Sequence, residues 1–594
     1  SYNYELKNGD GPIDPLGTGS KSGASTIQIA LPVHLISEGF NQVTLTVIKG
    51  GWVEFDSFKL LGPQQVKLLK DYTSIIKGVR QSDFELKKGN ERIQYMLLDL
   101  LKLKDGERIK VLLDGKKIYD KTHEKGLSRL EIPMPYVSKE VRSKYAIYIN
   151  DKLIQTSSIK RSPKRLGGVS DYVNTMIGAA HSRWMLAPGP WMPFGMVKIS
   201  PDNQNIGWQA GYEPSIESIG TFSHIHEWTM AGLGTFPTAG QLKTSVGDQY
   251  STHSGYRSPI DKASEQAPLG YYSVHLLDQD IDAKLTAGTR SSFQKYTYHK
   301  SDTGRIMIDL KVNAEYDYKI KDLSLKKVSD YKVIGYSNQL SENVWSTDAK
   351  QDYIVYFVME FDKPIINFGT WHNGRITDQS DLVADSAQSA GMYVEFDVRK
   401  NKEVQLRTGI SYVSIANAAE NLKTELSDPF GWSFERVVAN QHRVWNELLG
   451  RLEIKSDDYL EKEKFYTNMY RTLASRNTFS DVNGQWRSSD ETIRMMKHPG
   501  DLALGCDAFW NTFWNLNQFW NLVTPEWSNK WVRSQLAMYD ADGWLAKGPA
   551  GMEYIPVMVA EHEIPLIVGA YQMGIRDYDV TKAFEAIKKM QTTS

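Results

Sequence analysis

The sequence predicts a multidomain protein whose first part is built from β-strands and whose last part is built from α-helices. Until about residue 420, short alternating runs, such as residues 109–113 and 353–357, are separated by Gly, Asp, Asn and Pro turns, a pattern typical of an antiparallel β-sandwich. From Phe434 to Leu448, apolar residues recur every three or four positions instead, which predicts one face of a helix. The length of 594 residues is enough for about three to five domains.

Turn-rich segments divide the chain into four predicted regions. A strand-like run ends at Gly62-Pro63, the basic segment 160–168 is typical of a linker, and Ser427-Asp428-Pro429 precedes the helical periodicity. We therefore expect the end of a β module at 1–62, an accessory β domain at 63–165, a β-sandwich at 166–425 and a helical domain at 426–594. The first region is too short for a sandwich of its own, because such domains need about 100 residues.

The composition excludes several classes of function. The chain has 70 Lys+Arg against 71 Asp+Glu, a formal net charge of -1, whereas electrostatic capture of nucleic acid needs an excess of clustered Lys and Arg. Cys506 is the only cysteine, which excludes an internal disulfide and a cysteine-based zinc cluster. No run approaches the about 18 consecutive apolar residues of a membrane helix. We expect no nucleic-acid partner and no membrane span.

Tryptophan is concentrated near the end of the chain. Six of the 16 tryptophans occupy one short stretch, at Trp510, Trp514, Trp520, Trp527, Trp531 and Trp544. The pairs spaced by four residues can stack on one helix face and fill a core. Alternatively, an aromatic face near carboxylates forms a platform for the C–H face of a sugar ring. The density of tryptophan favours at least one such platform.

Glu553 is the strongest candidate for acid chemistry. It follows the Gly/Pro loop 547–550, precedes a helical run, and is flanked by Met552 and Tyr554. Desolvation by such neighbours favours the protonated form that a general acid needs. A solvated or helix-capping role is the alternative. Glu561 and Glu563 bracket His562 but lie two residues apart on diverging helix faces, and we expect one or both to be partnered structural groups.

A third candidate is the segment with His224 and His226. On a strand these two side chains share one face, and two histidines so spaced can begin a metal site. No other histidine cluster in the sequence supplies the missing ligands in an obvious pattern. We therefore favour hydrogen bonding to a polar ligand or within the core.

Several short motifs follow one another in a fixed order from about Ser170 onward. They include Asp-Tyr-Val-Asn-Thr-Met-Ile-Gly at 171–178, Pro-Gly-Pro-Trp-Met-Pro-Phe-Gly-Met-Val at 188–197, Ser-Pro-Asp at 200–202, Phe-Ser-His-Ile-His-Glu-Trp at 222–228, Gly-Tyr-Tyr-Ser-Val at 270–274 and Gly-Trp-Leu at 543–545, ahead of Glu553. In this order and spacing the chain resembles glycoside hydrolase family 92, the calcium-dependent exo-acting α-mannosidases.

The resemblance implies a fold and a reaction. The expected fold is an antiparallel β-sandwich packed on an (α/α)6 toroid, with smaller β domains in front, and with the sugar pocket between sandwich and toroid. Residues 1–62 resemble the last strands of a jelly-roll carbohydrate-binding module. The implied reaction is inverting hydrolysis that releases terminal mannose from glycans of the N-glycan type, with Ca²⁺ holding the mannose, outside the cytoplasm.

The resemblance also implies roles for individual residues. Glu553 would be the general acid, while a carboxylate base would activate water from about 6.5–9.5 Å away, as inversion requires. Trp228, His226 and Glu227 would form a wall of the sugar pocket, and Trp510 and Asn511 would contact the substrate.

Two features depart from the family pattern. Residues 510–514 read Trp-Asn-Thr-Phe-Trp where the family usually has Trp-Asp-Thr-Phe-Arg, so a carboxylate and a guanidinium are lost. After residue 430 about 165 residues remain, too few for twelve helices of about 11–12 residues with their connections. We therefore expect an incomplete toroid, with the base and the calcium ligands encoded beyond Ser594. The alternatives are a non-catalytic carbohydrate-binding protein and another (α/α)6 glycosidase or phosphorylase.

Overall fold

The chain has two compact units, Ser1–Lys70 and Asp71–Ser594. The computed structural model describes residues 75–88, 91–101, 103–124, 129–163, 167–179, 187–203, 211–227, 230–249, 254–313, 317–342, 350–456, 458–505, 509–550, 553–554 and 561–593. The β module expected at 1–62 lies outside the described residues.

The first described region is a small antiparallel β-sandwich. One sheet has the order β1-β2-β5 and the other the order β4-β3-β6-β7. The strands are β1 (Ile75–Lys88), β2 (Glu91–Leu101), β3 (Glu107–Leu113), β4 (Lys116–His123), β5 (Arg129–Met134), β6 (Val141–Ile149) and β7 (Lys152–Arg161). Alternate residues face inward, so that Leu98 and Ile132 of one sheet share a core with Val111 and Ile147 of the other.

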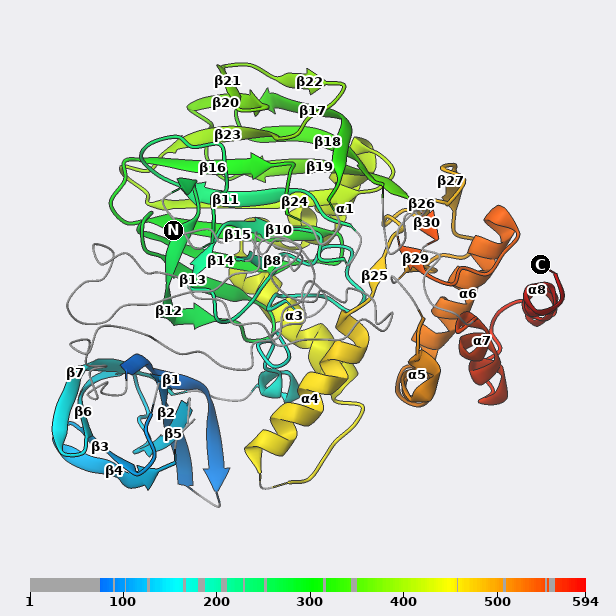
Figure 1. The fold of residues 1–594 in the computed structure, drawn as a ribbon. Helices are drawn as coiled ribbons and strands as arrows, with labels where there is room; N and C mark the ends of the chain where they lie inside the picture. The colour runs from blue at the N-terminus through cyan, green and yellow to red at the C-terminus, as the bar shows by residue number, and fades with distance from the viewer. Residues whose placement is uncertain are drawn as a thin grey trace, which may run out of the picture. The chain divides into compact units, whose positions relative to one another are not determined.

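The second region is a larger β-sandwich. Its seven-stranded sheet has the order β21-β20-β23-β16-β11-β10-β8, and its ten-stranded sheet has the order β22-β17-β18-β19-β24-β15-β14-β13-β12-β9 (Figure 1). The strands are β8 (Ser200–Asp202), β9 (Ser218–Ile219), β10 (Thr221–Ser223), β11 (Gly234–Thr238), β12 (Ser258–Gln266), β13 (Tyr272–Leu276), β14 (Ile281–Ala287), β15 (Ser291–Tyr298), β16 (Thr303–Asp309), β17 (Lys319–Ser329), β18 (Lys332–Ser341), β19 (Gln351–Phe361), β20 (Asn367–His372), β21 (Arg375–Asp378), β22 (Leu382–Ala384), β23 (Ala390–Asp397) and β24 (Glu403–Ser411).

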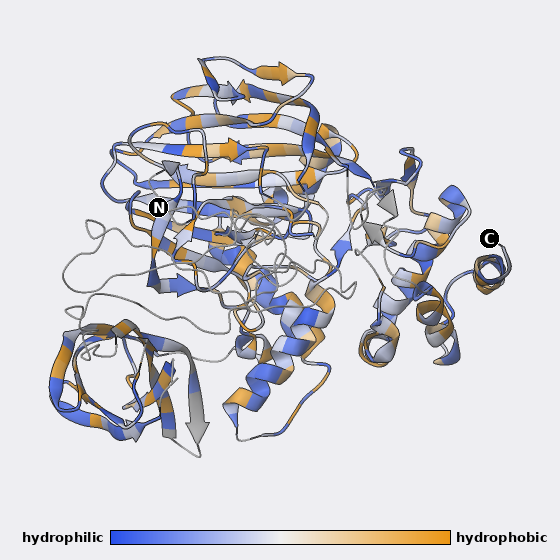
Figure 2. Cartoon of the chain, viewed as in Figure 1, coloured by the Kyte–Doolittle hydropathy of each residue, from blue (hydrophilic) through white to orange (hydrophobic). Residues whose placement is uncertain are grey.

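Alternating hydropathy explains why these residues form strands. Along β18 every second residue is buried, and Figure 2 shows the same alternation of hydrophobic and hydrophilic residues on neighbouring strands. Phe222 of the seven-stranded sheet packs against Tyr272 and Tyr296 of the ten-stranded sheet, with ring centroids 6.4 Å apart in both pairs. The prediction of an antiparallel β-sandwich followed by helices is confirmed.

The last region is mainly helical. Its helices are α1 (Ile415–Leu422), the π-helical turn η4 (Lys423–Ser427), α2 (Asp428–Phe430), α3 (Phe434–Leu449), α4 (Tyr459–Ala474), the 3-10 turn η5 (Thr512–Trp514), α5 (Leu516–Val523), α6 (Pro525–Asp542), α7 (Glu563–Gln572) and α8 (Val580–Thr592). Short strand pairs interrupt them: β25 (Asn477–Thr478) with β28 (Leu504–Gly505), β26 (Gln485–Arg487) with β27 (Ile493–Met495), and β29 (Pro549–Ala550) with β30 (Glu553–Tyr554). Of the helices described, none is both long and apolar enough to cross a membrane.

The helical region begins earlier than the periodicity near residue 430 indicated. Ser414 caps α1, because its side chain accepts a hydrogen bond from the backbone N–H of Asn417. The α1 helix is too short to show a repeating pattern, whereas the predicted helix at Phe434 is confirmed as α3, which buries Val437 and Trp445.

Two sets of contacts join the sandwich to the helices. The backbone of Phe194 donates to the carbonyl of Leu473 (2.7 Å) and accepts from the N–H of Thr478 (2.8 Å). Its ring packs against Trp520, Trp527 and Trp531, at centroid distances of 4.6–5.7 Å.

The second set of contacts centres on a buried carboxylate. Asp481 accepts hydrogen bonds from Ser411 of β24 and from Asn417 and Asn421 of α1, at 2.6–2.7 Å. Nearby, Arg290 pairs with Glu425 at 2.9 Å. The junction between the two regions is therefore held by both apolar packing and charge-assisted hydrogen bonds.

Candidate active site

His226 is held in the sandwich by a buried carboxylate. Its Nε2 lies 2.8 Å from Oδ1 of Asp202, and both residues are less than a tenth exposed. The antiparallel pairing of β8 with β10 sets this contact, because it places Thr221 opposite Asp202 and Ser223 opposite Ser200. The ring of Trp191 lies 6.4 Å from that of His226. His226 therefore has a fixed orientation, which suits a residue in the wall of a binding site.

His224 is a core residue rather than a metal ligand. Its Nδ1 lies 2.8 Å from the carbonyl oxygen of Leu233, which can only accept, so Nδ1 carries the proton. Its Nε2 lies 2.9 Å from Oγ of Ser292. Burial lowers the pKa of His224 to about 4, which keeps the ring neutral. The hydrogen-bonding interpretation of this segment is therefore supported for His224, and no lone pair is left for a metal.

Glu227 lies next to His226 and is almost completely buried. Burial raises the pKa of Tyr412 well above its usual range, and the negative charge of Glu227 is the second largest cause. Glu227 is therefore within electrostatic reach of the end of β24, close to where the sandwich meets α1. Trp228, the third predicted wall residue, lies outside the described residues.

Trp510 and Asn511 lie on a turn and not on a helix. Asn511 has a left-handed backbone (φ 61°), which Asn tolerates better than most residues, and only Thr512–Trp514 form a 3-10 turn. The predicted stacking of Trp510 and Trp514 on one helix face is therefore wrong, because the left-handed residue between them breaks the helical path. Trp510 is 55% exposed and Trp514 is 69% exposed.

The other described tryptophans of this stretch mostly fill the core, as the core-filling interpretation stated. Trp531 lies on α6, is fully buried and stacks on the buried Trp520 with ring centroids 5.6 Å apart. Trp510 and Trp514 are thus the tryptophans whose faces are most available to a ligand among those described.

Glu553 lies on a very short β-hairpin. The structure places its backbone in β30, paired with Ala550 of β29, and its side chain is outside the described part. The sequence predicted a loop before a helix, and the helix α7 begins only at Glu563. Replacing a loop by a strand pair gives Glu553 a defined backbone position.

The segment with Trp510 and Asn511 runs beside the segment that carries Glu553. At one end, the N–H of Phe509 donates to the carbonyl of Lys547 (3.4 Å). At the other end, the ring of Phe513 stacks on His562, with centroids 5.3 Å apart and planes inclined by 13°. Lys547 and His562 flank Glu553 in sequence, at six and nine residues' distance, so these contacts connect the Trp510 and Asn511 segment to both sides of the segment that carries Glu553.

The two carboxylates beside His562 differ from each other. Glu561 lies 3.8 Å from the amino group of Lys547, so the prediction of a partnered structural group is confirmed for it. Glu563 is fully buried, and apart from its own backbone N–H its carboxylate oxygens have no hydrogen-bond partner in the described part of the chain. Burial raises its pKa to about 7. A partnered role is therefore not supported for Glu563.

Two buried asparagines of α5 share this property. Asn517 and Asn521 are spaced by four residues, so they face the same side of the helix, and their amide atoms have no partner among the described residues. A Cβ added at Gly569 of α7 would lie 3.5 Å from the amide nitrogen of Asn521. The α5–α7 layer, defined as these two helices, therefore contains buried polar atoms that have no hydrogen-bond partner among the described residues.

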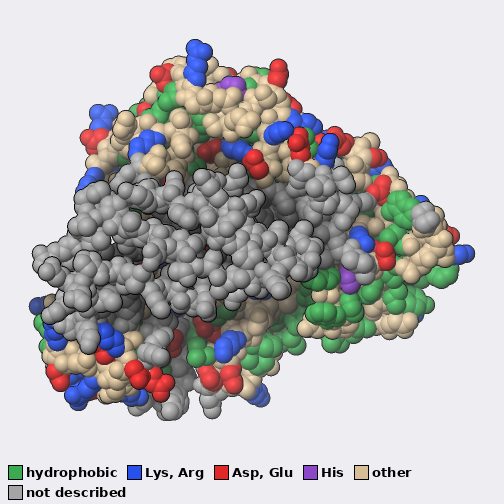
Figure 3. Space-filling model, viewed as in Figure 1, with side chains coloured by type: hydrophobic (Ala, Val, Ile, Leu, Met, Phe, Trp, Pro, Cys, Tyr) green, Lys and Arg blue, Asp and Glu red, His purple; other side chains and the backbone are tan. Residues whose placement is uncertain are grey.

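Hydrophobic side chains gather on the surface over the same layer (Figure 3). The large exposed hydrophobic residues here are Trp510, Phe513, Trp514, Leu522, Val568 and Tyr571. Exposed apolar patches of this kind mark binding sites more often than chance.

Sequence reasoning missed two contacts of this site. Asp202 was seen only as part of a motif, and its pairing with His226 depends on strand register across 24 residues. The stack of Phe513 on His562 joins segments far apart in sequence. The sequence could have pointed to Asp202, because a buried histidine such as His226 needs a hydrogen-bond partner and Asp202 lies in a neighbouring strand-forming segment.

The one described cluster of close His, Cys, Asp or Glu donor atoms does not suit calcium. Ca²⁺ takes six to eight oxygen ligands, whereas the one described group of three His, Cys, Asp or Glu side chains with close donor atoms contains two imidazoles, those of His275 and His299, beside Asp282. Nitrogen-rich donor sets do not fit this ion, so no reaction step is derived through calcium.

Comparison with protein families identifies the chain. Residues 172–411 match the glycosyl hydrolase family 92 N-terminal domain, and residues 417–594 match the glycosyl hydrolase family 92 catalytic domain. The two matches follow each other in the order of the sandwich and the helical region. The chain belongs to glycoside hydrolase family 92.

Solved structures agree with this assignment. A family GH92 alpha-mannosidase from Bacteroides thetaiotaomicron is 26% identical, with a TM-score of 0.66 over 72% of this chain and 58% of that chain. The same enzyme in complex with mannoimidazole has a TM-score of 0.65, 26% identity and coverages of 72% and 56%. An inverting GH92 mannosidase from the same organism shares the fold at 23% identity, with a TM-score of 0.61 and coverages of 72% and 56%. The chain thus spans less than two thirds of the length of these structures. No curated protein matches it significantly.

Proposed function

We propose that the protein is a glycoside hydrolase that releases terminal mannose from α-mannosides with inversion of configuration. The observation that carries the proposal is the match of residues 417–594 to the catalytic domain of the family, with Glu553 kept on its hairpin beside an exposed aromatic segment. The similar structures are alpha-mannosidases, and one of them is a complex with mannoimidazole.

In this proposal Glu553 is the general acid. Its carboxylic proton passes to the glycosidic oxygen as the bond to the anomeric carbon breaks, so that the departing alcohol leaves neutral. Inversion requires water to attack from the opposite face of the sugar, activated by a second carboxylate about 6.5–9.5 Å from the first. We assign no described residue to that base.

The remaining residues bind and orient the sugar. Asp202 fixes the ring of His226, which with Glu227 and Trp228 lines the pocket wall. Trp510 offers an exposed face to the C–H side of a sugar ring. The amide of Asn511 can donate to or accept from a hydroxyl, but it provides no charge.

Calcium, location and substrate class follow from the family resemblance. The substrate is a mannose-containing glycan, met outside the cytoplasm. Calcium, when bound, would polarise and orient the sugar hydroxyls. Because the one described cluster of close donor atoms does not suit this ion, its ligands stay unassigned.

A second candidate is a carbohydrate-binding protein without catalysis. Two observations favour it: Asn511 in the position where a carboxylate is usual, and the exposed Trp514 where an arginine is usual. The left-handed backbone at Asn511 suits Asp as well as Asn, so backbone geometry does not explain the substitution.

Hydrolysis of an α-mannosyl disaccharide by the purified protein tests the proposal, because its sugar leaving group must be protonated to depart as an alcohol. We expect turnover that falls by about 10²–10⁴-fold in Glu553→Gln, since Gln cannot donate the proton, while Glu561→Gln, which alters only a long surface ion pair, keeps it. Calorimetry with the same mannoside separates the candidates. Binding without turnover in the wild-type protein selects the second candidate, and equal turnover in Glu553→Gln overturns the role of Glu553.

A further inference from the structure

Three polar side chains converge on the outer face of the ten-stranded sheet. His275 lies on β13, Asp282 lies opposite it on β14, and His299 follows β15 directly. The N–H of His299 donates to the carbonyl of Asp280 (3.1 Å), which fixes the end of β15 against the turn before β14. Three adjacent strand segments therefore present these side chains at one place.

The donor atoms of this group are close to one another. Nδ1 of His275 lies 2.8 Å from Oδ1 of Asp282, and Nε2 of His299 lies 2.9 Å from Oδ2 of the same carboxylate. The three ligand atoms all lie within 4.8 Å of one another. The two imidazole rings have centroids 5.9 Å apart. One carboxylate thus faces two imidazole nitrogens, each of which is a metal-binding atom.

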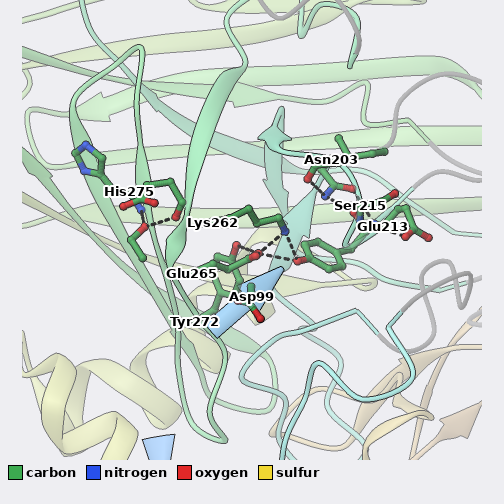
Figure 4. Close-up of polar contacts among 12 residues, drawn as sticks. Asp99, Asn203, Glu213, Ser215, Lys262, Glu265, Tyr272 and His275 are labelled. Atoms are coloured by element: carbon green, nitrogen blue, oxygen red, sulfur yellow. Dashed lines mark hydrogen bonds and ion pairs between the residues drawn. The ribbon is translucent and has the colours of Figure 1, made fainter. Parts of the chain in front are cut away.

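The supporting strands are anchored in the core through their opposite face. The residues that alternate with the three ligands, Tyr272, Val274, Ile281, Ala283 and Tyr298, are buried in the sandwich core. Figure 4 shows the imidazole of His275 turned away from Tyr272 and from the buried Glu265. Because sheet scaffolds hold side chains more firmly than loops, the donor set is preorganised.

We propose that His275, Asp282 and His299 bind one divalent transition-metal ion, with Zn²⁺ as the best match. Two imidazoles and one carboxylate form a ligand set that suits Zn²⁺ and related ions and disfavours Ca²⁺. Asp280 lies 3.6 Å from Nε2 of His275 and adds negative charge beside the site, although it also pairs with Lys300 at 2.9 Å.

The distances fit such an ion after a small adjustment. Zinc binds nitrogen and carboxylate oxygen at about 2.0–2.2 Å in a tetrahedral arrangement, so two of its ligand atoms lie about 3.3–3.6 Å apart. The contacts of Asp282 at 2.8 and 2.9 Å would lengthen slightly to admit the ion, and the three atoms already lie within 4.8 Å of one another. Three protein ligands leave a fourth position for water, which distinguishes this site from a closed structural centre.

Bound metal would tie the β13–β14 hairpin to the end of β15. None of its ligands belongs to the proposed sugar site, so the metal is expected to raise thermal stability without changing mannoside hydrolysis. This site does not rest on the proposed function, and the experiment below does not measure hydrolysis.

Calorimetric titration with zinc chloride tests the site. The full-length protein, without a histidine tag and stripped with a chelator, should bind one Zn²⁺ at this site, and a Co²⁺ titration should give the visible absorption of a nitrogen- and oxygen-ligated ion. His299→Gln removes one of three ligands at an exposed position, and should weaken Zn²⁺ binding at least 10-fold.

His372→Gln is the matched control. His372 is partly exposed and lies outside the proposed site, and its Nε2 contacts the carbonyl of Ser386, so its replacement should leave zinc binding unchanged. The melting temperature without metal should be the same in both variants. Absence of zinc binding, or equal binding by wild type and His299→Gln, overturns the proposal, as does competition by millimolar Ca²⁺.

Discussion

Two buried glutamates, Glu265 of the β-sandwich and Glu563 of the α5–α7 layer, differ in their hydrogen bonding. In the sandwich, Glu265 accepts hydrogen bonds from Tyr212 and Tyr272, both at 2.7 Å, and pairs with Lys262 at 2.6 Å. Figure 4 shows Lys262 and Tyr272 beside Glu265. In the α5–α7 layer, the buried side chain of Glu563 has no such partner among the described residues. A buried glutamate thus has side-chain hydrogen-bond donors in the sandwich, and none among the described residues of the α5–α7 layer.

Aromatic residues show the same contrast. Trp191 and Trp371 of the sandwich are buried, whereas Trp510 and Trp514 beside the α5–α7 layer are exposed. A buried polar group without a partner costs about 1–3 kcal/mol, and exposed aromatic faces forgo burial energy. Trp510 and Trp514 therefore offer exposed faces to a ligand, which Trp191 and Trp371 do not. Buried polar atoms without a partner are not confined to the α5–α7 layer, because Nε1 of Trp371 and Oγ1 of Thr408 in the sandwich also have none among the described residues.

The largest expected effect on stability is at the junction of the sandwich and the helical region, where the buried carboxylate of Asp481 is fully hydrogen-bonded. Asp481→Ala would leave the buried donors of Ser411, Asn417 and Asn421 without their common acceptor. We expect a loss of about 4 kcal/mol in the free energy of unfolding, measured by urea denaturation.

Asp490 provides the control for this prediction. It also accepts hydrogen bonds from its neighbours, including Thr492 and Arg494, but its side chain is 38% exposed. Water can replace these bonds, so Asp490→Ala should cost less than about 1 kcal/mol. Equal losses of unfolding free energy in the two variants would show that burial does not make the hydrogen bonds of Asp481 more important than those of Asp490.

The next effect is a dependence of sandwich stability on pH. Burial lowers the pKa of His224 from 6.5 to about 4, so the unfolded chain takes up a proton below pH 6.5 while the folded protein does not. Stability is therefore lost as pH falls from 6.5 to 4, by about 3 kcal/mol. In His224→Asn, whose amide can still donate to Leu233, the melting temperature should fall less steeply over this range. Equal slopes in both proteins would show that His224 is protonated when folded.

Periodicity explains what the sequence could predict of the fold. Strands such as β18 and the helix α3 bury every second or every third and fourth residue, and this pattern is local. The early start of α1 was missed because eight residues give too little repetition. The turn at Asn511 was missed because spacing by four residues does not specify a helix when the backbone between is left-handed.

The candidate site was only partly predictable for a related reason. Glu553 and His226 were identified through motifs, which are local in sequence. The contacts that position these residues are tertiary. The register of β8 and β10 places Asp202 beside His226, and the ring of Phe513 stacks on His562 at the start of α7. Neither register nor packing is encoded in a short segment.

Glu563 should give the opposite pH dependence to His224. Burial raises its pKa from 4.5 to about 7, so the folded protein keeps a proton that the unfolded chain has released. Stability is therefore lost as pH rises from 4.5 to 7, and Glu563→Gln should be more stable than wild type above pH 7, by about 3 kcal/mol. Melting temperatures of both proteins between pH 4.5 and 8 measure this. A constant difference across the range would mean that the carboxyl does not titrate there.

The smallest expected effect concerns the exposed tryptophans. If the face of Trp510 is used by a sugar ring, Trp510→Ala should weaken mannoside binding by about 10-fold, or about 1.4 kcal/mol, with little change in stability because the side chain is 55% exposed. Trp544→Ala is the matched control: its ring is 37% exposed, but it faces the amino group of Lys589 at 4.4 Å. Calorimetric titration of both variants with the same mannoside separates a binding platform from a tryptophan that is merely exposed. If the two variants bind the mannoside equally well, the exposed face of Trp510 is not a sugar platform.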